Sequence, residues 1–410
     1  MLPKLAYVCD PHSFGMMSIA EAATDICDLI WILDSSDPDF GNMPRLLSRL
    51  GVVVDVAELT EEEAADKVAL EGPAGIVCFV DHRLVWTARV ADRLGVPFVD
   101  ELTATRLSDK RAQRESLRAA GLPVPGFWTI DAPMTDDEWS TLERDASFPA
   151  ILKPRHGGGS RDTVSIASIT ELREILADGG SELVLETYIP DGDASIAGEG
   201  FAGYLSVESV VAEGSIRHLA VTGRTPVATP FRETGLFIPS SVSEETRSAA
   251  IEMADRAASA IGVSIGCLHT EIKLTPDGPV VIEVNGRIGG GVPEILELAS
   301  GYRILQIAFR VALGEHVELE EIPECSCVAY YLMIQAPTSF HRITAIEGLD
   351  DLRSFPGVES IFLNRGVGQA VDWREGNHGY VYSVTGAADD HDALRGLVTA
   401  VPSIVRISGE

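Results

Sequence analysis

The feature that most constrains this chain is a polar face on a hairpin that should otherwise be buried. The stretch CLHTEIKLTPDGPVVIEVNGR, residues 267–287, alternates apolar and polar positions around a Thr-Pro-Asp-Gly-Pro turn, which is typical of two antiparallel strands. If the hairpin folds symmetrically about Asp277, Glu271 lies directly across from Glu283. Side chains so opposed have Cβ atoms about 5 Å apart, and two carboxylates at that distance repel by about 3 kcal/mol at an effective dielectric near 20. We therefore expect compensation, either by a shared proton or by divalent cations between the acids.

The same register places His269 across from Asn285, which adds an amide to the two acids. Glu271, Glu283 and Asn285 offer oxygen ligands only, and these suit Mg²⁺, which keeps several waters and takes substrate phosphates as its remaining ligands. The alternative is an offset hairpin, in which Glu271 pairs with Lys273 or Arg287 on an ordinary solvated face. The hairpin alone leaves both alternatives open.

Two lysines precede features that suit phosphate. Lys153 ends the apolar strand PAILKP, and the loop HGGGSRDT follows it. Glycines let backbone N–H groups approach an anion, and a lysine supplies a point charge. Because the lysine precedes the glycines, this is not a Walker A loop, and an ordinary Gly-rich hairpin loop is the alternative. Lys110 heads the helix DKRAQRESL, which Ser108 or Asp109 caps; it is a surface lysine unless the helix start faces the same cleft.

A third signal is the segment ELVLETYIPDGDASIAG. Glu186 lies on a buried strand that turns through Pro-Asp-Gly and presents Asp193. The free backbone groups at the end of the strand suit an adenine edge, and the acid suits ribose hydroxyls. An interdomain linker is the alternative interpretation.

The first 100 residues predict a parallel α/β sheet covered on both faces. Apolar runs alternate there with helical patterns, as in parallel α/β proteins, and the first strand leads into DPHSFGMM, so no GxGxxG site for a dinucleotide follows it. The predicted strands are residues 5–10, 28–34, 52–57, 74–81 and 96–99. From Ser108 the pattern changes to α+β, with one long helix expected over residues 292–314.

The composition of the chain argues against some classes of binding partner. The chain has 62 acidic and 32 basic residues and a net charge of −30, which argues against a nucleic acid or an anionic membrane. We find no signal peptide and no apolar run long enough to span a membrane. The six cysteines form no CxxC pair, so we expect reduced thiols in a cytoplasmic protein.

Together these elements resemble the ATP-grasp superfamily over residues 105–315. The DK-headed helix, the strand ending in KP before a Gly-rich loop, the LETYI hinge and the TEIK…VIEVNGR hairpin follow one another in that order. The runs FRETGLFIPSS and NGRIGGGVPEILELASGYRI are similar to those of dipeptide-forming L-amino acid ligases, although Leu236 stands where some relatives have a histidine. The resemblance implies an α/β and α+β multidomain protein. Its expected parts are an N-terminal α/β domain (1–104), the two α+β subdomains of an ATP-grasp core (105–190 and 191–322) and a small α+β C-terminal domain (323–410).

The resemblance also implies roles for individual residues. The catalytic residues would be Lys153, Glu283 and Arg287, the last steadying the transferring phosphoryl group, and Glu271, Glu283 and Asn285 would bind two Mg²⁺. ATP would be held by Lys110, Lys153, His156, Gly158, Gly159, Ser160, Glu186, Thr187, Tyr188, Ile189 and Asp193, with the loop 156–161 as a lid. Substrate would meet Arg224, Arg232, Glu233, Arg287, Gly290 and Gly291.

The implied activity is ligation of a carboxylate to an amine through an acyl-phosphate, with release of ADP and phosphate. Such an enzyme acts on small molecules, and by analogy with the family it forms a homodimer. Two alternatives stay open: another ATP-grasp chemistry, such as carboxylation with bicarbonate or ligation onto a nucleotide precursor, and a non-catalytic ATP-binding module.

Overall fold

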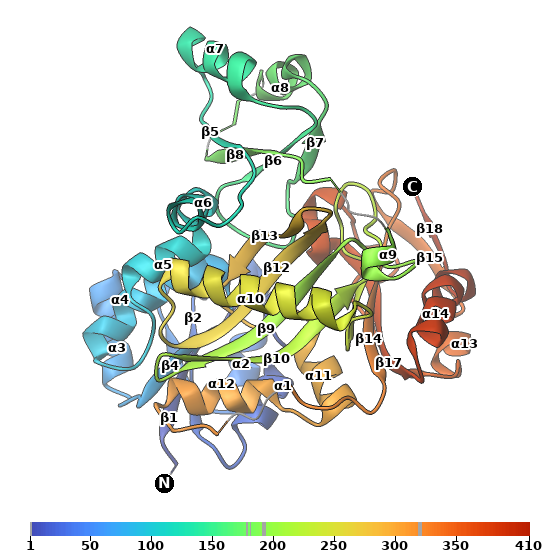
Figure 1. Cartoon of the computed structure of the whole chain (residues 1–410). Coiled ribbons are helices and arrows are strands. Elements are labelled where there is room, and N and C mark those ends of the chain that lie inside the picture. The colour runs from blue at the N-terminus through green and yellow to red at the C-terminus, as the bar shows by residue number, and fades with distance from the viewer. Residues whose placement is uncertain (1, 178, 181, 191–193, 319–321) are drawn as a thin grey trace.

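The computed structural model describes residues 2–177, 179–180, 182–190, 194–318 and 322–410. Within these ranges the strands form four sheets, and helices cover them (Figure 1). The predicted α/β and α+β organisation is confirmed. No helix in the described ranges is both long and apolar enough to cross a membrane. The predicted boundaries at 104, 190 and 322 remain a proposal.

The N-terminal sheet is parallel, as predicted, with the strand order β3-β2-β1-β4. Strand β2 reads DLIWIL and is buried along all but its first residue, as expected for a strand covered on both faces. The elements are β1 Lys4–Val8, α1 Met16–Ala23, β2 Asp28–Leu33, η1 Pro38–Phe40, α2 Met43–Leu47, β3 Val52–Asp55, α3 Glu61–Ala69, β4 Gly75–Cys78, η2 Asp81–Arg83 and α4 Leu84–Leu94.

The fifth predicted strand, residues 96–99, is wrong. Residues 96–99 are irregular and lead into the next helix. Pro97 has no N–H for a ladder, and the apolar character of the run has another cause: Val99 is buried in the core.

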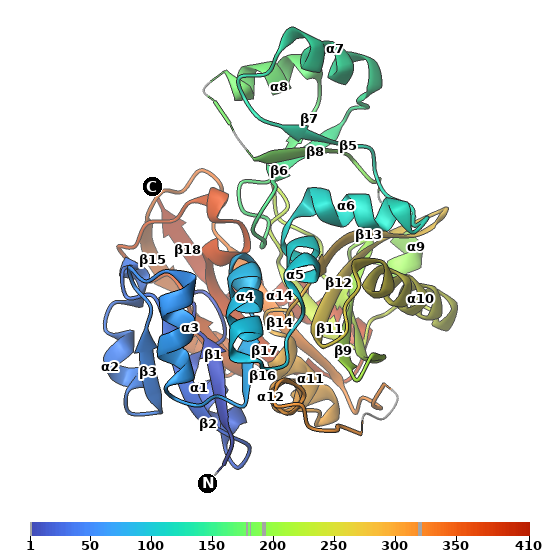
Figure 2. The same ribbon diagram turned by 90° about the vertical axis from the view of Figure 1, so that its left-hand side faces the viewer.

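A second sheet stands apart from the body of the molecule (Figures 1 and 2). Its order is β5-β8-β6-β7, and all its pairs are antiparallel. It has a small core of its own, in which Leu142 and Leu172 from the two covering helices meet Leu152 and Leu185. The elements that lead to it and form it are α5 Glu101–Ser108, α6 Lys110–Ala119, β5 Phe127–Ile130, α7 Asp136–Asp145, β6 Ala150–Pro154, β7 Val164–Ile166, α8 Ile169–Leu176 and β8 Leu183–Thr187.

The largest sheet has eight strands in the order β13-β12-β9-β10-β11-β14-β17-β16. Helix α10 packs on one face, while α11, α12 and the N-terminal sheet share a core with the other. Its elements up to residue 312 are α9 Ala194–Ala197, β9 Tyr204–Ala212, β10 Ser215–Arg224, β11 Gly235–Ile238, α10 Glu244–Ile261, β12 Gly266–Thr275, β13 Gly278–Asn285, α11 Val292–Ser300 and α12 Ile304–Ala312.

The single helix expected over residues 292–314 is wrong. The chain forms two helices there, because Gly301 adopts φ +79°, a left-handed conformation that ends α11.

The last part of the chain continues the eight-stranded sheet and adds a two-stranded one. Helix α14 packs against β14 and β17, and their side chains form a third core. The elements are β14 Val328–Gln335, β15 Ile343–Glu347, α13 Leu349–Arg353, β16 Val358–Leu363, η3 Trp373–Gly379, β17 Tyr380–Ala388, α14 His391–Ile404 and β18 Arg406–Gly409.

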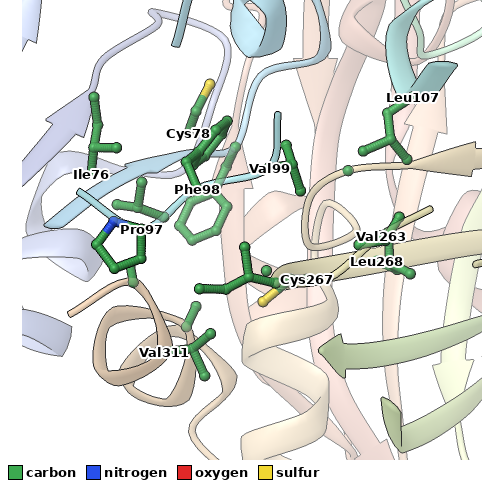
Figure 3. Close-up of a pocket in the computed structure, with 17 residues that line it drawn as sticks. Ile76, Cys78, Pro97, Phe98, Val99, Leu107, Val263, Cys267, Leu268 and Val311 are labelled. Atoms are coloured by element: carbon green, nitrogen blue, oxygen red, sulfur yellow. The ribbon is translucent and has the colours of Figure 1, made fainter. Parts of the chain in front are cut away.

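A small apolar cavity of about 40 Å³ lies where the N-terminal sheet meets β12 and α12 (Figure 3). Its walls include Val99, Cys267 and Val311. Because unfilled apolar volume costs about 24 cal/mol per Å³, Val311→Ile is expected to raise the free energy of unfolding by up to about 1 kcal/mol in urea titrations. The matched variant Val52→Ile adds the same methyl group at a 39% exposed position and should change it by less than about 0.5 kcal/mol. A loss of stability in Val311→Ile would show that the site is already full.

Candidate active site

The two acids of the hairpin lie opposite each other, as predicted. Strands β12 and β13 pair Glu271 with Glu283, and His269 with Asn285. The alternative of an offset hairpin is therefore wrong.

The turn of this hairpin differs from the prediction. Thr275 pairs with Gly278, so the turn has two residues and is not centred on Asp277. A β-bulge follows, in which Ile282 is the extra residue of β13, and the bulge restores the predicted register for the acids. The carbonyl of Ile282 accepts a hydrogen bond from Arg114, so the bulge is fixed from α6.

Each acid has a cationic partner within the protein. Lys110 Nζ lies 3.1 Å from Glu283 Oε1, and His269 Nε2 lies 3.3 Å from Glu271 Oε1. Burial lowers the pKa of His269, but the charge and hydrogen bonds of Glu208 and Glu271 outweigh it and raise that pKa to about 9. Burial raises the pKa of Glu271, while the hydrogen bond and charge of His269 bring it down to about 2. At neutral pH both members of this pair are charged, and the repulsion between the acids is offset.

The donors present fit magnesium chemically. The Glu271 and Glu283 side chains are 22% and 17% exposed and line one cavity. Asn285 is buried, its Nδ2 donates to His269 O (3.3 Å), and it is not among the residues that line this cavity. In the described residues no three His, Cys, Asp or Glu side chains form a metal centre. The predicted set has two acids and an amide, the kind of partial shell that Mg²⁺ completes with phosphates and water.

The two predicted phosphate lysines reach the same cavity from different elements. Lys110 begins α6, whose N-cap is Asp109, one of the two predicted caps, and Asp109 also accepts from Arg155 (Nε to Oδ1, 2.8 Å). Lys153 comes from β6 and is buried, and burial lowers its pKa. Both lysines line the cavity.

Glu186 sits behind Lys153 and holds it in place. Its carboxylate contacts Lys153 Nζ at 2.8 Å and Arg114 Nε at 3.0 Å. Burial raises the pKa of Glu186, but the charges of Arg114 and Lys153 outweigh it and lower that pKa to about 2. Glu186, which was predicted to contact adenine, is therefore already ion-paired with Lys153 and Arg114.

Glu186→Gln is expected to lower the free energy of unfolding by about 3 kcal/mol at pH 7, because two buried cations lose their counter-charge. The folded pKa of about 2 lies below the ordinary value, so this contribution is complete above about pH 4.3 and is lost as the pH falls toward 2. Urea unfolding at pH 7 and pH 3 should show the gap between wild type and variant shrinking at pH 3. The control Glu174→Gln removes an exposed acid of the same subdomain, and an equal effect there would contradict the prediction.

At the part of the cavity predicted to hold adenine, the backbone N–H groups of two of the three predicted residues already donate within the protein. The N–H of Thr187 donates to Gly126 O (2.8 Å), and that of Tyr188 donates to Pro149 O (3.1 Å). Thr187, Tyr188 and Ile189 all line the cavity, as predicted for residues that meet a base. Asp193, predicted to hold the ribose, lies outside the described residues.

The cavity that joins these groups has a volume of about 970 Å³. The Gly-rich loop forms one wall, and His156, Gly158, Gly159 and Ser160 all line it. The carbonyl of Gly157 accepts from Lys110 Nζ, so the loop and the first phosphate lysine are joined. The lining also takes residues from the N-terminal and C-terminal parts of the chain, namely His82 and Asn377.

Arg287 lies under the Gly-rich loop and has a partner that was not predicted. Its Nε donates to Asp81 Oδ2 at 2.8 Å, from η2 of the N-terminal part. The second carboxylate oxygen, Oδ1, is buried and has no hydrogen-bond partner among the described residues. A Cβ at Gly158 would lie 3.0 Å from Asp81 Oδ2 and 3.6 Å from Arg287 Nη2. No motif in the sequence connects Asp81 with the site, so only the fold could reveal it.

The predicted substrate residues divide into two groups. Glu233 lines the cavity, and Arg224 lies behind it, 2% exposed, with Nε 3.2 Å from Glu233 Oε1. Arg232 points elsewhere: its guanidinium donates to the carbonyls of Thr229 (2.9 and 2.7 Å) and Ala336 (2.7 Å) and so fixes the loop before β11.

Gly290 and Gly291 lie before α11 and outside the cavity wall. A Cβ at Gly291, which has φ +76°, would lie 2.8 Å from the Tyr331 ring. The neighbouring Gly289 is equally constrained, because a Cβ there would lie 2.5 Å from His269 Nδ1.

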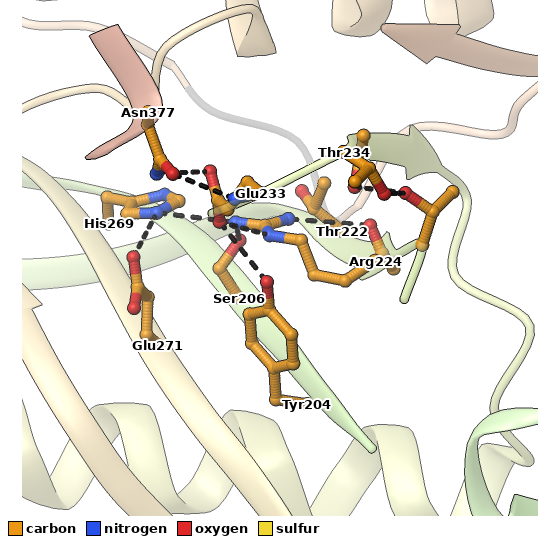
Figure 4. A network of polar contacts seen from close by, with 12 residues as sticks. Tyr204, Ser206, Thr222, Arg224, Glu233, Thr234, His269, Glu271 and Asn377 are labelled. Carbon is orange, nitrogen blue, oxygen red and sulfur yellow. Dashed lines mark hydrogen bonds and ion pairs between the residues drawn. The ribbon is translucent and has the colours of Figure 1, made fainter. Parts of the chain in front are cut away.

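A buried polar network that the sequence did not predict connects Glu271 to Glu233 (Figure 4). His269 Nδ1 lies 2.9 Å from Glu208 Oε2, and Glu208 also accepts from Ser206 (2.6 Å) and Thr222 (3.1 Å). Arg224 Nη2 donates to Ser206 Oγ at 2.9 Å. A signal for His269 was present, since it alternates with Glu271 on one face of β12.

Comparison with known proteins agrees with this geometry. Residues 146–294 match the family model described as ATP-grasp domain. The chain is 26% identical over 221 residues to alanine–anticapsin ligase of Bacillus subtilis (50% of this chain, 46% of the relative) and 25% identical over 303 residues to carnosine synthase 1 of Mus musculus (68% and 36%). It thus spans less than half the length of these two relatives.

Among solved structures, an L-amino acid ligase from Bacillus licheniformis superposes with a TM-score of 0.80 at 23% identity, covering 100% of this chain and 99% of that one. Other structures that share the fold include complexes with ADP and with magnesium ADP. The chain therefore carries an ATP-grasp domain, and the predicted resemblance to the ATP-grasp superfamily is confirmed. Along its whole length it has the fold of the L-amino acid ligase structure, and its relatives include enzymes named as ligases.

Proposed function

We propose that this protein is an ATP-dependent carboxylate–amine ligase that joins two amino acids, or an amino acid and a related amine. The observation that carries the proposal is the pair Glu271 and Glu283, opposed across β12 and β13 and facing one cavity with Lys110 and Lys153. Relatives named alanine–anticapsin ligase and carnosine synthase support the reaction class.

In the first step, an oxygen of the substrate carboxylate attacks the γ-phosphorus of ATP. The new O–P bond forms as the bond to the β-phosphate oxygen breaks, which gives an acyl-phosphate and ADP. Lys110 and Lys153 hold the phosphates, and Arg287 stabilises the charge on the transferring group. Magnesium ions, two by analogy with the family, would be held by Glu271, Glu283 and Asn285 and would neutralise phosphate charge and align the groups.

In the second step, the amine of the other substrate attacks the acyl carbon. The C–N bond forms as the C–O bond to phosphate breaks, and the proton that the amine loses passes to the departing phosphate. Water must be kept out, because hydrolysis would destroy the acyl-phosphate. The Gly-rich loop over the cavity suits this task, since it can open for exchange and close for the reaction.

Phosphate release measured across a panel of amino-acid pairs tests the proposal. We expect release that needs MgATP and both amino acids, with a matching amide product by mass spectrometry. Release driven by bicarbonate alone would indicate a carboxylating enzyme instead. ATP binding without any turnover across the panel would indicate a nucleotide-binding module.

A further inference from the structure

The 3₁₀ segment Trp373–Gly379 joins two parts of the proposed site that the sequence treats as separate. It belongs to the C-terminal part of the chain, between β16 and β17. One side of this segment contacts the Gly-rich loop, and the other contacts Glu233. Neither contact serves a step of the reaction as proposed above.

The contact with the loop is made by backbone at close range. Asn377 N donates to Gly159 O (2.7 Å), and Asp162 N donates to Arg374 O (3.0 Å). Gly376 has φ +61°, and a Cβ there would lie 2.2 Å from Gly159 O and 2.7 Å from Arg161 N. Glycine is thus required at position 376 for two reasons: the positive φ angle and the close approach of the loop backbone.

The contact with Glu233 uses both ends of one side-chain amide. Asn377 Oδ1 accepts from Glu233 N (2.8 Å), and Asn377 Nδ2 donates to Glu233 Oε2 (3.0 Å), as Figure 4 shows. Glu233 Oε1 is shared by Arg224 Nε at 3.2 Å and Tyr204 Oη at 3.4 Å. Both oxygens of the carboxylate therefore have partners in the protein, and the partner of Oε2 is Asn377.

We propose that Gly376 and Asn377 couple closure of the Gly-rich loop to binding of a substrate ammonium group at Glu233. This inference rests on the proposed function. Glu233 lines the cavity and is not among the predicted magnesium ligands, so its carboxylate suits the ammonium group of an amino acid, with Arg224 on its Oε1 and Asn377 on its Oε2. When the loop closes, its hydrogen bonds with Arg374 O and Asn377 N fix the position of the segment. The side-chain amide of Asn377 is fixed with it and orients the Glu233 carboxylate. By linkage, an ammonium group at Glu233 stabilises the closed loop to the same degree.

Two variants separate the two sides of the segment. Asn377→Ala removes the amide but keeps the backbone bond to Gly159, so Asn377 acts as a positioning residue whose loss should raise KM for the amino acid about tenfold while the Kd for ATP changes less than twofold. Gly376→Ala forces the loop away and should speed hydrogen exchange of residues 157–163 about tenfold. Arg374→Gln is the control, because the Arg374 side chain is 59% exposed and pairs with Asp372, while its backbone carbonyl is retained.

The decisive measurement is hydrogen exchange of the loop in the presence of magnesium and a non-hydrolysable ATP analogue. Adding an amino acid that supports turnover should slow exchange in wild type and in Arg374→Gln, and should have no effect in Asn377→Ala. An equal response in Asn377→Ala overturns the coupling, as does the absence of any response in wild type. If no amino acid supports phosphate release, the proposed function fails, while normal loop exchange in Gly376→Ala would by itself refute the role of the segment.

Discussion

Glu283→Gln is expected to lower amino-acid-dependent phosphate release by about 100-fold or more. The substitution keeps the shape of the side chain but removes one of the two opposed charges, and stabilisation by a phosphate-bound metal contributes several kcal/mol to such transition states. The variant should remain folded by circular dichroism, because Glu283 is at the cavity wall and not in an apolar core.

Asp277→Asn is the matched control for this experiment. It removes a carboxylate from the same hairpin, at the exposed turn between β12 and β13, and should leave phosphate release unchanged. ADP formation by Glu283→Gln at the wild-type rate would count against the metal role and against the reaction class with it.

Arg287→Ala is expected to lower kcat by about 10³-fold while the Kd for ATP changes less than about threefold. The guanidinium stabilises charge that develops on the transferring group, and donors of this kind act on the transition state more than on the bound nucleotide. Steady-state kinetics and a fluorescence titration with ATP separate the two quantities.

Two further variants test whether a loss of activity in Arg287→Ala comes from loss of folding. Arg287→Lys keeps a charge near Asp81 but not the planar fork, so it should fold and still lose most of kcat. Asp81→Asn keeps a hydrogen-bond acceptor for Arg287 Nε and should lower kcat only about five- to tenfold. Unchanged turnover in Arg287→Ala would remove the arginine from the mechanism.

The sequence predicted those parts of the fold in which local patterns carry the information. The parallel N-terminal sheet, the helix start at Ser108 or Asp109 and the opposition of Glu271 and Glu283 are examples. The predictions were wrong where tertiary contacts or a single glycine, and not the local hydrophobic pattern, determine the secondary structure. Residues 96–99 are apolar because they fill a core and not because they pair, and Gly301 divides a continuous apolar period into two helices.

Within the site, the sequence predicted chemistry better than orientation. Glu186, predicted to contact adenine, is instead paired with Lys153 and Arg114. Arg232, predicted to contact substrate, donates to backbone carbonyls. Asp81 and Asn377 reach the site from segments about 200 and 90 residues away from Arg287, and no local pattern marks such a contact.

The enclosure of the cavity has a consequence for how this architecture can diversify. Lys110, Asp81 and Asn377 all lie outside the stretch that matches the ATP-grasp domain, so an excised fragment 146–294 would expose its acids to water on several sides. Apart from Lys110, which is proposed to hold phosphate, the parts of the chain outside residues 146–294 supply walls of the cavity such as His82 and Asn377. Substitutions in these walls can change which carboxylate and which amine the enzyme accepts, while the residues proposed to bind ATP and magnesium stay the same.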